Sequence, residues 1–410
     1  MRRALNESVN SRTPPEPTGE AAATDVRWGQ TARLALGTTS ALGLGRFAYG
    51  LILPAMRSEL GWSLAKAGGL TTANAVGYLL GAVAAAHVAH RLTVTATFRL
   101  GMILNAAALA ATAATGNYPV LLLTRAATGL GGALVFIAGG VIASHTAASA
   151  RSATPLAVYY AGAGLGIAVS GATVPILLAH HPGRWPLAWV GLAAAGCLAT
   201  VISWTAARGN HDTSPATNLA GARTVVRLWQ PAIAYLLFAA GYIAYITFLS
   251  AYLTSKHASV AQITLTWTVL GIAAVAAPAL WSRPIGTWPR ARALAVLLAV
   301  LSVAAVVALA GAPLAVTGSA IGYGATFLAV PAAVTALVRA ATRPSQWTGA
   351  LAAFTVVFAA GQTAGPYLAG ALADRYGTGA TLAWTAALCA AGAALSILTR
   401  ETHERTSGAS

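Results

Sequence analysis

The chain has 410 residues, of which 57% are hydrophobic and only 8% are charged, and its mean hydropathy is +0.67. Since soluble domains have about 25% charged residues, this composition excludes a soluble globular protein. The net charge of +16 does not indicate nucleic-acid binding, because the basic residues fall between apolar segments and not on one polar face. We therefore expect an integral membrane protein with no nucleic-acid partner.

Residues 1–28 form a polar segment that contains Pro14, Pro15 and Pro17. The segment lacks the short apolar core and the small-residue cleavage site of a secretory signal peptide. We predict a disordered cytoplasmic tail here, followed by a first apolar segment that acts as an uncleaved anchor.

Twelve apolar segments follow, each long enough to cross a bilayer as a helix of about 20 residues. A polar linker at 208–228 separates a six-helix bundle at 29–207 from a second one at 229–399, and residues 400–410 form a second cytoplasmic tail. The sequence thus predicts an all-α integral membrane fold. The segments lie at roughly 30–56, 64–88, 98–114, 118–143, 154–178, 185–207, 229–253, 263–281, 291–310, 315–337, 347–371 and 379–398.

The basic residues predict the orientation of these spans. Of the 25 lysines and arginines, eighteen fall in the tails and in every second connection, five fall in the other connections, and Arg46 and Arg125 lie inside spans. Because cytoplasmic loops carry the excess of positive charge, we predict a multi-pass protein of the bacterial cytoplasmic membrane with both termini cytoplasmic.

The two halves repeat a pattern of glycines. Residues Gly162, Gly166 and Gly171 of the fifth segment match Gly361, Gly365 and Gly370 of the eleventh, at a constant offset of 199 residues. Small residues at such spacing let helices pack closely, so we predict helix packing for these six positions. The offset also predicts two pseudo-symmetric bundles with a binding site between them at mid-membrane.

Three stretches carry a family resemblance: Gly43 to Tyr49, Asn74 to Gly81, and Gly241 to Leu249. Together they resemble the bacterial YbfB/YjiJ-type branch of the major facilitator superfamily. The resemblance implies two six-helix bundles that rock around a central site. The loop from His87 to Leu92 departs from the superfamily pattern, since it lacks the usual Asp. A similar string with Asp374 and Arg375 follows the eleventh segment instead.

An arginine inside a span costs at least ~2.5–3.5 kcal/mol, so its presence needs a reason. The sequence has only Glu59 and Asp374 as acids in its apolar stretches, so we interpret Arg46 as a cation that binds an anionic or polar solute. The alternative is a structural arginine that satisfies loose helix carbonyls. Polar residues at predicted mid-span positions complete the candidate binding set: Arg46, Tyr49, Asn74, Tyr78, Tyr242, Tyr245 and Gln362.

Candidate coupling and gating residues are Arg125, Gly129, Asp374 and Arg375. Arg125 and Gly129 resemble an arginine motif that the superfamily uses in proton-coupled members. A side chain that reaches toward the outer interface is the alternative for Arg125. Asp374 and Arg375 have local ion pairs or helix caps as their alternative.

These features predict a secondary active transporter that moves a small organic solute by alternating access, anionic or polar, with efflux preferred. The alternatives are uptake or exchange of a small carboxylate, or a non-transporting membrane sensor on the same fold. We expect a monomer in the lipid bilayer, a small-molecule substrate, and protons as the candidate coupling ion. The sequence shows no phosphate-binding loop and no set of catalytic or metal-binding side chains, so we expect no enzyme activity, cofactor or metal.

Overall fold

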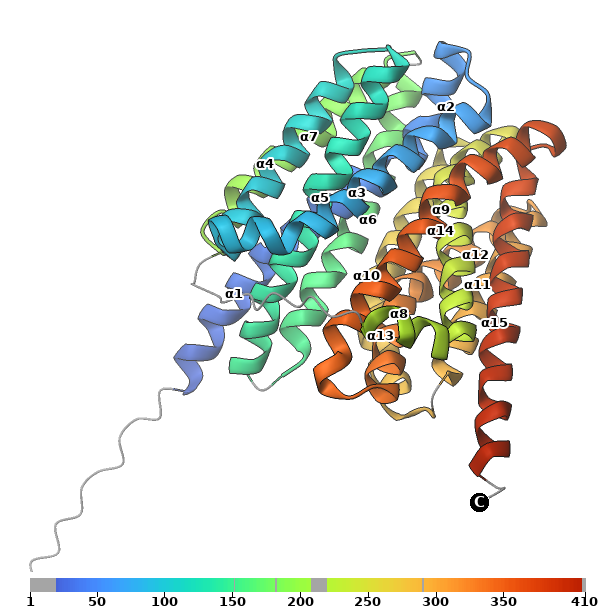
Figure 1. Cartoon of the computed structure of the whole chain (residues 1–410). Helices are drawn as coiled ribbons and strands as arrows, with labels where there is room; N and C mark the ends of the chain where they lie inside the picture. The colour runs from blue at the N-terminus through green and yellow to red at the C-terminus, as the bar shows by residue number, and fades with distance from the viewer. Residues whose placement is uncertain (1–19, 151, 181–182, 208–219, 290, 408–410) are drawn as a thin grey trace, which may run out of the picture.

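The computed structural model describes residues 20–150, 152–180, 183–207, 220–289 and 291–407 (Figure 1). Within these residues the chain is helical and contains no strand. Residues 1–19 of the predicted tail at 1–28, residues 208–219 of the predicted linker at 208–228, and residues 408–410 lie outside the described residues.

The first half contains the helices of the N-terminal bundle, and one of them is a π-helix, η1. They are α1 (Glu20–Thr38), η1 (Thr39–Phe47), α2 (Tyr49–Leu60), α3 (Leu64–Leu92), α4 (Val94–Ala113), α5 (Tyr118–Ser149), α6 (Thr154–His180) and α7 (Trp185–Ser203).

The second half begins with a short helix and contains the C-terminal bundle. Its helices are α8 (Ala220–Arg227), α9 (Trp229–Ser255), α10 (Val260–Thr287), α11 (Arg292–Leu309), α12 (Pro313–Phe327), α13 (Val330–Ala341), the 3-10 turn η2 (Pro344–Gln346), α14 (Trp347–Tyr376) and α15 (Gly379–Ser407).

Eleven helical segments of the described chain are long and apolar enough to cross a membrane, with α12 and α13 forming one of them. The predicted first span is divided among the end of α1, η1 and α2, and it becomes the twelfth when these pieces are read as one segment. The twelve-helix membrane fold expected from the sequence is therefore confirmed.

Three element boundaries differ from the sequence prediction. Helix α1 begins at Glu20, inside the predicted tail, and α15 continues to Ser407 through most of the second tail. Helix α8 occupies the last part of the predicted linker. These polar stretches have no apolar periodicity of membrane-spanning length, so the sequence pattern did not reveal that they extend or precede helices.

Short connections between spans follow from their turn residues. Gly61 ends α2 with a left-handed φ of 64°, a conformation that costs glycine little. Ser63 then caps α3 by accepting a hydrogen bond from the backbone N–H of Lys66. This Gly-x-Ser sequence lets two spans meet within three residues.

The glycine pattern predicted from the sequence lies in close helix contacts, repeated in the two halves. A Cβ atom added to Gly162 would meet the Ala35 carbonyl of α1, and one added to Gly361 would meet the Leu236 carbonyl of α9. These contacts join the first and fifth spans of each bundle. Neither glycine could carry a side chain unless its helix moved away from the facing helix.

The contacts between the bundles repeat in the same way. A Cβ at Gly171 of α6 would lie 2.7 Å from Cβ of Trp267 in α10, and one at Gly370 of α14 would lie 2.5 Å from the Leu64 carbonyl of α3. Each bundle thus uses its fifth span to contact the second span of the other. The pair of contacts has the arrangement of a pseudo-two-fold axis between bundles.

The bundles meet mainly at one end of the molecule. We call the end where α1 begins and α15 ends the termini end, and the opposite end, which carries the α2–α3 and α14–α15 connections, the far end (Figure 1). Thr71 contacts Thr247 with 3.2 Å between their hydroxyls, and Thr72 donates to the Thr363 carbonyl at 2.7 Å. All four residues lie in the far-end halves of their helices, and the bundles splay apart toward the termini end (Figure 1).

Candidate functional site

The site begins with the unusual backbone of the first span. In η1 the N–H of Ala48 bonds to the carbonyl of Gly43 at 3.0 Å, a spacing of five residues that defines the π-helix. The glycines permit close packing here, because a Cβ at Gly43 would overlap the Gly166 backbone of α6. The π-helix ends with Arg46 and Phe47, and Arg46 is only 6% exposed.

Arg46 reaches across the interface between the bundles. Its Nη2 donates a hydrogen bond to Oε1 of Gln362 on α14, and Gln362 is fully buried. The hydroxyl of Tyr242 on α9 lies 3.4 Å from the same oxygen. Arg46 Nε and Gln362 Nε2 are buried without a partner. The contact therefore joins a cation of one bundle to an amide of the other and leaves two donors unused.

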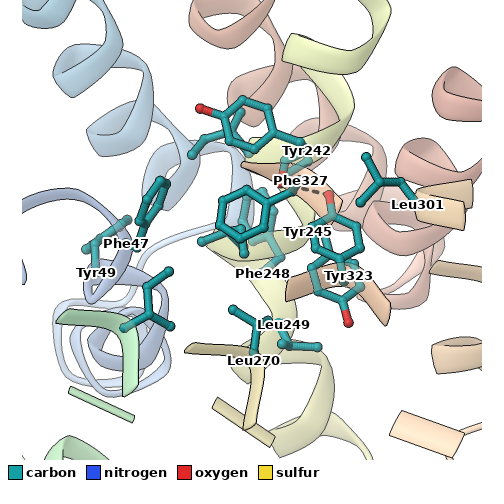
Figure 2. Packing of buried hydrophobic residues seen from close by; sticks show 14 of the residues in the cluster. Phe47, Tyr49, Tyr242, Tyr245, Phe248, Leu249, Leu270, Leu301, Tyr323 and Phe327 are labelled. Carbon is teal, nitrogen blue, oxygen red and sulfur yellow. Dashed lines mark hydrogen bonds between the residues drawn. The ribbon is translucent and has the colours of Figure 1, made fainter. Parts of the chain in front are cut away.

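Aromatic rings surround this contact. The guanidinium carbon of Arg46 lies 5.3 Å from the centre of the Tyr78 ring and 5.9 Å from that of Phe47. Phe47 in turn meets Phe327 of the C-terminal bundle edge-on, with 5.7 Å between ring centres, and Figure 2 shows both near Tyr242. Ring faces attract a cation, so these contacts hold the Arg46 charge in place without a carboxylate.

Arg125 has a different environment, inside the N-terminal bundle. It is 0% exposed, so the interpretation that its side chain reaches toward the outer interface is wrong. Its Nη1 donates to the Gly45 carbonyl of η1 at 2.7 Å, and its guanidinium carbon lies 5.4 Å from the Tyr49 ring and 5.2 Å from the Trp189 ring. The structural role that was the alternative for Arg46, donation to a free carbonyl of the first span, is thus filled by Arg125.

Three of the candidate binding residues bond within their own bundle. Tyr49 donates to the Ala67 carbonyl at 2.8 Å, and the Asn74 side-chain amide donates to the Arg125 carbonyl at 3.1 Å. Tyr245 contacts the Ser319 hydroxyl at 2.8 Å and stacks on Tyr323 (Figure 2). The structure brings together the other four, which are Arg46, Tyr78, Tyr242 and Gln362.

The candidate gating residues lie in two places. Asp374, at the far end of α14, accepts hydrogen bonds from the backbone N–H groups of Leu64 at 2.6 Å and Ala65 at 2.9 Å, in the first turn of α3. Arg375 lies over the ring of its neighbour Tyr376, at 5.7 Å. Gly129 packs against the Asn74 backbone, where α5 meets α3. Asp374 is therefore the member of this set that joins the bundles.

The C-terminal bundle carries a cluster of stacked aromatic rings that was not predicted from the sequence. Phe238 stacks on Tyr242 with 4.8 Å between ring centres, and Phe358 stacks on Tyr235 at 4.9 Å and on Tyr242 at 5.7 Å. The spacing of 235, 238 and 242 places these three rings on one face of a helix, and this spacing was the available signal. Phe358 is one turn before Gln362, on the same face of α14.

A comparison with family models identifies the chain. The model of a family described as "Uncharacterised MFS-type transporter YbfB" matches residues 38–400. The chain belongs to this major facilitator superfamily (MFS) family. It is thus a multi-pass membrane protein from a family of secondary transporters, and the resemblance stated from the sequence is confirmed. Among curated proteins, no sequence matches the chain.

Solved structures agree on the fold. The nucleoside transporter NupG matches with a TM-score of 0.72 at 13% identity, covering 90% of this chain and 97% of that one. A bacterial homologue of the human lysosomal transporter Spinster, in an inward-facing and occupied conformation, matches with a TM-score of 0.70 at 16% identity. The match covers 93% of this chain and 97% of that one. A bacterial homologue of the human drug peptide transporters PepT1 and PepT2 matches with a TM-score of 0.71 at 13% identity. The match covers 94% of this chain and 100% of that one. At these identities the likeness shows the shared fold only.

Proposed function

We propose that this protein exports a small organic anion across the bacterial cytoplasmic membrane, and that the anion binds at the Arg46–Gln362 contact. The observation that carries the proposal is this contact itself. Arg46 belongs to one bundle and Gln362 to the other, so any rocking motion that separates the bundles changes the contact. A ligand bound there would be released or captured by the same motion, as alternating access requires.

The sign of the ligand's charge follows from the charged residues around the site. Arg46 is 6% exposed and has only rings and an amide as partners. The two acids that flank the predicted spans are elsewhere: Asp374 bonds to the α3 backbone at the far end, and Glu59 lies at the last turn of α2. An anion next to Arg46 would gain from the low dielectric, whereas a cation would be repelled.

Coupling follows from the same distribution of acids. A proton carried by the protein through the membrane needs a titratable group near the site, and the predicted spans have no carboxylate at mid-depth. We therefore propose that the protein exchanges one anion for another. A proton that travelled on the solute would enter with it, so an inward proton gradient would drive the alternative, which is uptake. With the termini cytoplasmic, the far-end contacts would close the outer side, and the site would face the cytoplasm, the side on which an exported solute binds.

The test uses purified protein and ligand-induced thermal stabilisation. The panel contains small carboxylates, neutral sugars and amphipathic cations, applied to wild type, Arg46→Gln and Arg283→Ala, a variant that removes an exposed arginine of α10. We expect stabilisation by carboxylates in wild type and in Arg283→Ala, and at least ~10-fold weaker binding in Arg46→Gln, since a charge-assisted hydrogen bond is lost. Equal carboxylate affinity in Arg46→Gln would overturn the anion site.

A flux assay tests direction. Inside-out membrane vesicles, loaded with no solute, should accumulate the stabilising carboxylate when a lumen-positive membrane potential is imposed, if the protein exports it. Accumulation in right-side-out vesicles instead would support the alternative of uptake. Exchange would appear as uptake that requires unlabelled carboxylate inside the vesicle.

A further inference from the structure

The aromatic side chains near Arg46 form two walls on opposite bundles. The first wall comprises Tyr78, Phe136 and Tyr160, on α3, α5 and α6, with 6.4 Å between the first two ring centres and 5.1 Å between the last two. Each of these three rings is only half-buried, although it lies within a long apolar span. Ring surface thus remains uncovered on the N-terminal bundle.

The second wall comprises Tyr235, Phe238, Tyr242 and Phe358, on α9 and α14. Its rings are nearly parallel, with interplanar angles of 16° between Phe238 and Tyr242 and 21° between Tyr242 and Phe358. Phe358 is half-buried, whereas the other three are buried. A stack of parallel rings presents flat apolar surface, which matches a flat ligand better than a branched one.

The two walls meet at Arg46 and Gln362. Tyr78 of the first wall lies against the Arg46 guanidinium, and the Tyr242 hydroxyl of the second lies beside Gln362 Oε1. Because a guanidinium only donates, Gln362 presents its oxygen to Arg46 and keeps its NH2 group as a free donor. Together with Arg46 Nε, the site therefore has two unused donors and flat apolar walls.

Buried donors without partners are unfavourable, and a ligand that supplies two acceptor oxygens would satisfy both. A carboxylate has two such oxygens, and its negative charge would pair with the positive charge of Arg46. An aliphatic acid would satisfy the donors but gain no stacking, and a neutral aromatic compound would leave the charge unpaired. We propose that the solute is a planar aromatic carboxylate, an inference that rests on the proposed anion transport and specifies the chemical class.

Paired probes separate the two parts of the ligand. Benzoate and cyclohexanecarboxylate share the acid and differ in the flat ring, whereas benzoate and benzamide share the ring and differ in charge. Titration calorimetry on the purified full chain should show ~3–10-fold tighter binding of benzoate than of cyclohexanecarboxylate, the range expected for aromatic stacking. Benzoate should also bind at least ~10-fold more tightly than benzamide.

Variants assign each preference to its residues. Tyr78→Leu and Phe358→Leu should each reduce the benzoate-to-cyclohexanecarboxylate ratio toward one and keep carboxylate binding. Tyr376→Leu, which removes a ring that is 67% exposed at the far end of α14, should leave the ratio unchanged. Arg46→Gln should remove the preference for benzoate over benzamide and retain the ring preference.

The outcomes distinguish failure of this inference from failure of the proposed function. Equal affinity for the two carboxylates, lost in Arg46→Gln, would overturn the aromatic assignment and leave an anion transporter. Absence of carboxylate binding, or binding that Arg46→Gln does not change, would overturn both. A folded state of each variant is verified beforehand by its thermal unfolding and gel-filtration profile.

Discussion

The carboxylate of Asp374 accepts a hydrogen bond of 2.6 Å from the backbone N–H of Leu64, across the interface between the two bundles. The N–H belongs to the first turn of α3, where helix N–H groups have no partner within the helix. The positive end of the helix dipole adds to the attraction. Asp374 thus caps a helix of the opposite bundle and joins the two bundles at the far end.

The Asp374→Asn substitution should favour the state that is open at the far end. The amide removes the charge and one acceptor, and hydrogen bonds to charged groups contribute ~1.5–3 kcal/mol, which corresponds to at least ~10-fold in the equilibrium. Pulsed electron paramagnetic resonance between spin labels at Ser58 and Thr254, both exposed at the far end, should show more of the longer distance.

The matched control is Glu59→Gln, which removes an acid at the far end of α2. It should leave the distance distribution unchanged. If Asp374→Asn also leaves the distances unchanged, the contact does not bias the conformational equilibrium.

Arg125→Met should destabilise the protein more than Arg46→Gln does. It leaves the Gly45 carbonyl of the π-helix without its donor at 0% exposure, which costs ~1–3 kcal/mol for a buried polar group. Arg125→Lys keeps the charge but loses the planar surface between Tyr49 and Trp189, so we expect an intermediate effect. Apparent melting temperatures at one scan rate measure the order. Unchanged melting of Arg125→Met would contradict the structural role.

Gly43→Ala should lower the apparent melting temperature through overpacking. The added Cβ would overlap the Gly166 backbone of α6, and insertion of one carbon into a packed interior costs ~1–3 kcal/mol. Gly318→Ala is the matched control, since a Cβ there meets nothing within 4 Å inside α12. The control should be neutral or stabilised by up to ~1 kcal/mol through helix propensity. Equal effects of both substitutions would contradict the packing argument.

A reporter fused after Ser410 should report a cytoplasmic C-terminus. Green fluorescent protein should fluoresce there, and alkaline phosphatase should be inactive, because the positive charges predict cytoplasmic termini. Active phosphatase would reverse the orientation and the side to which the site opens.

The membrane spans were predictable because their signal is local. Composition over about 20 residues identifies a span, and the glycine offset between Gly162 and Gly361 is a repeat visible in the sequence. The η1 geometry was not visible, because its hydrogen-bond pattern depends on packing of Gly43 against α6. Polarity in an apolar span selected Arg46 and Gln362 separately, but their contact joins residues 316 positions apart.

Roles were harder to predict than positions. Arg46 and Arg125 both appear in the sequence as arginines without acids nearby, and only the fold places the first at the interface and the second inside a bundle. Asp374 had a local helix cap among its interpretations, yet the helix it caps is 310 residues away. Such partners depend on tertiary packing, which spacing along one helix does not encode.

In the proposed anion transport, the uncompensated charge of Arg46 would make the two halves of the cycle electrically different. With a monoanion bound, the site is neutral, so reorientation of the loaded protein is insensitive to membrane potential. The empty site carries a positive charge, whose movement across the full potential corresponds to about 2.3 kcal/mol per 100 mV. In this proposed cycle an inside-negative potential would draw the empty site toward the cytoplasm. Solid-supported membrane currents should accompany the return step in wild type and vanish in Arg46→Gln.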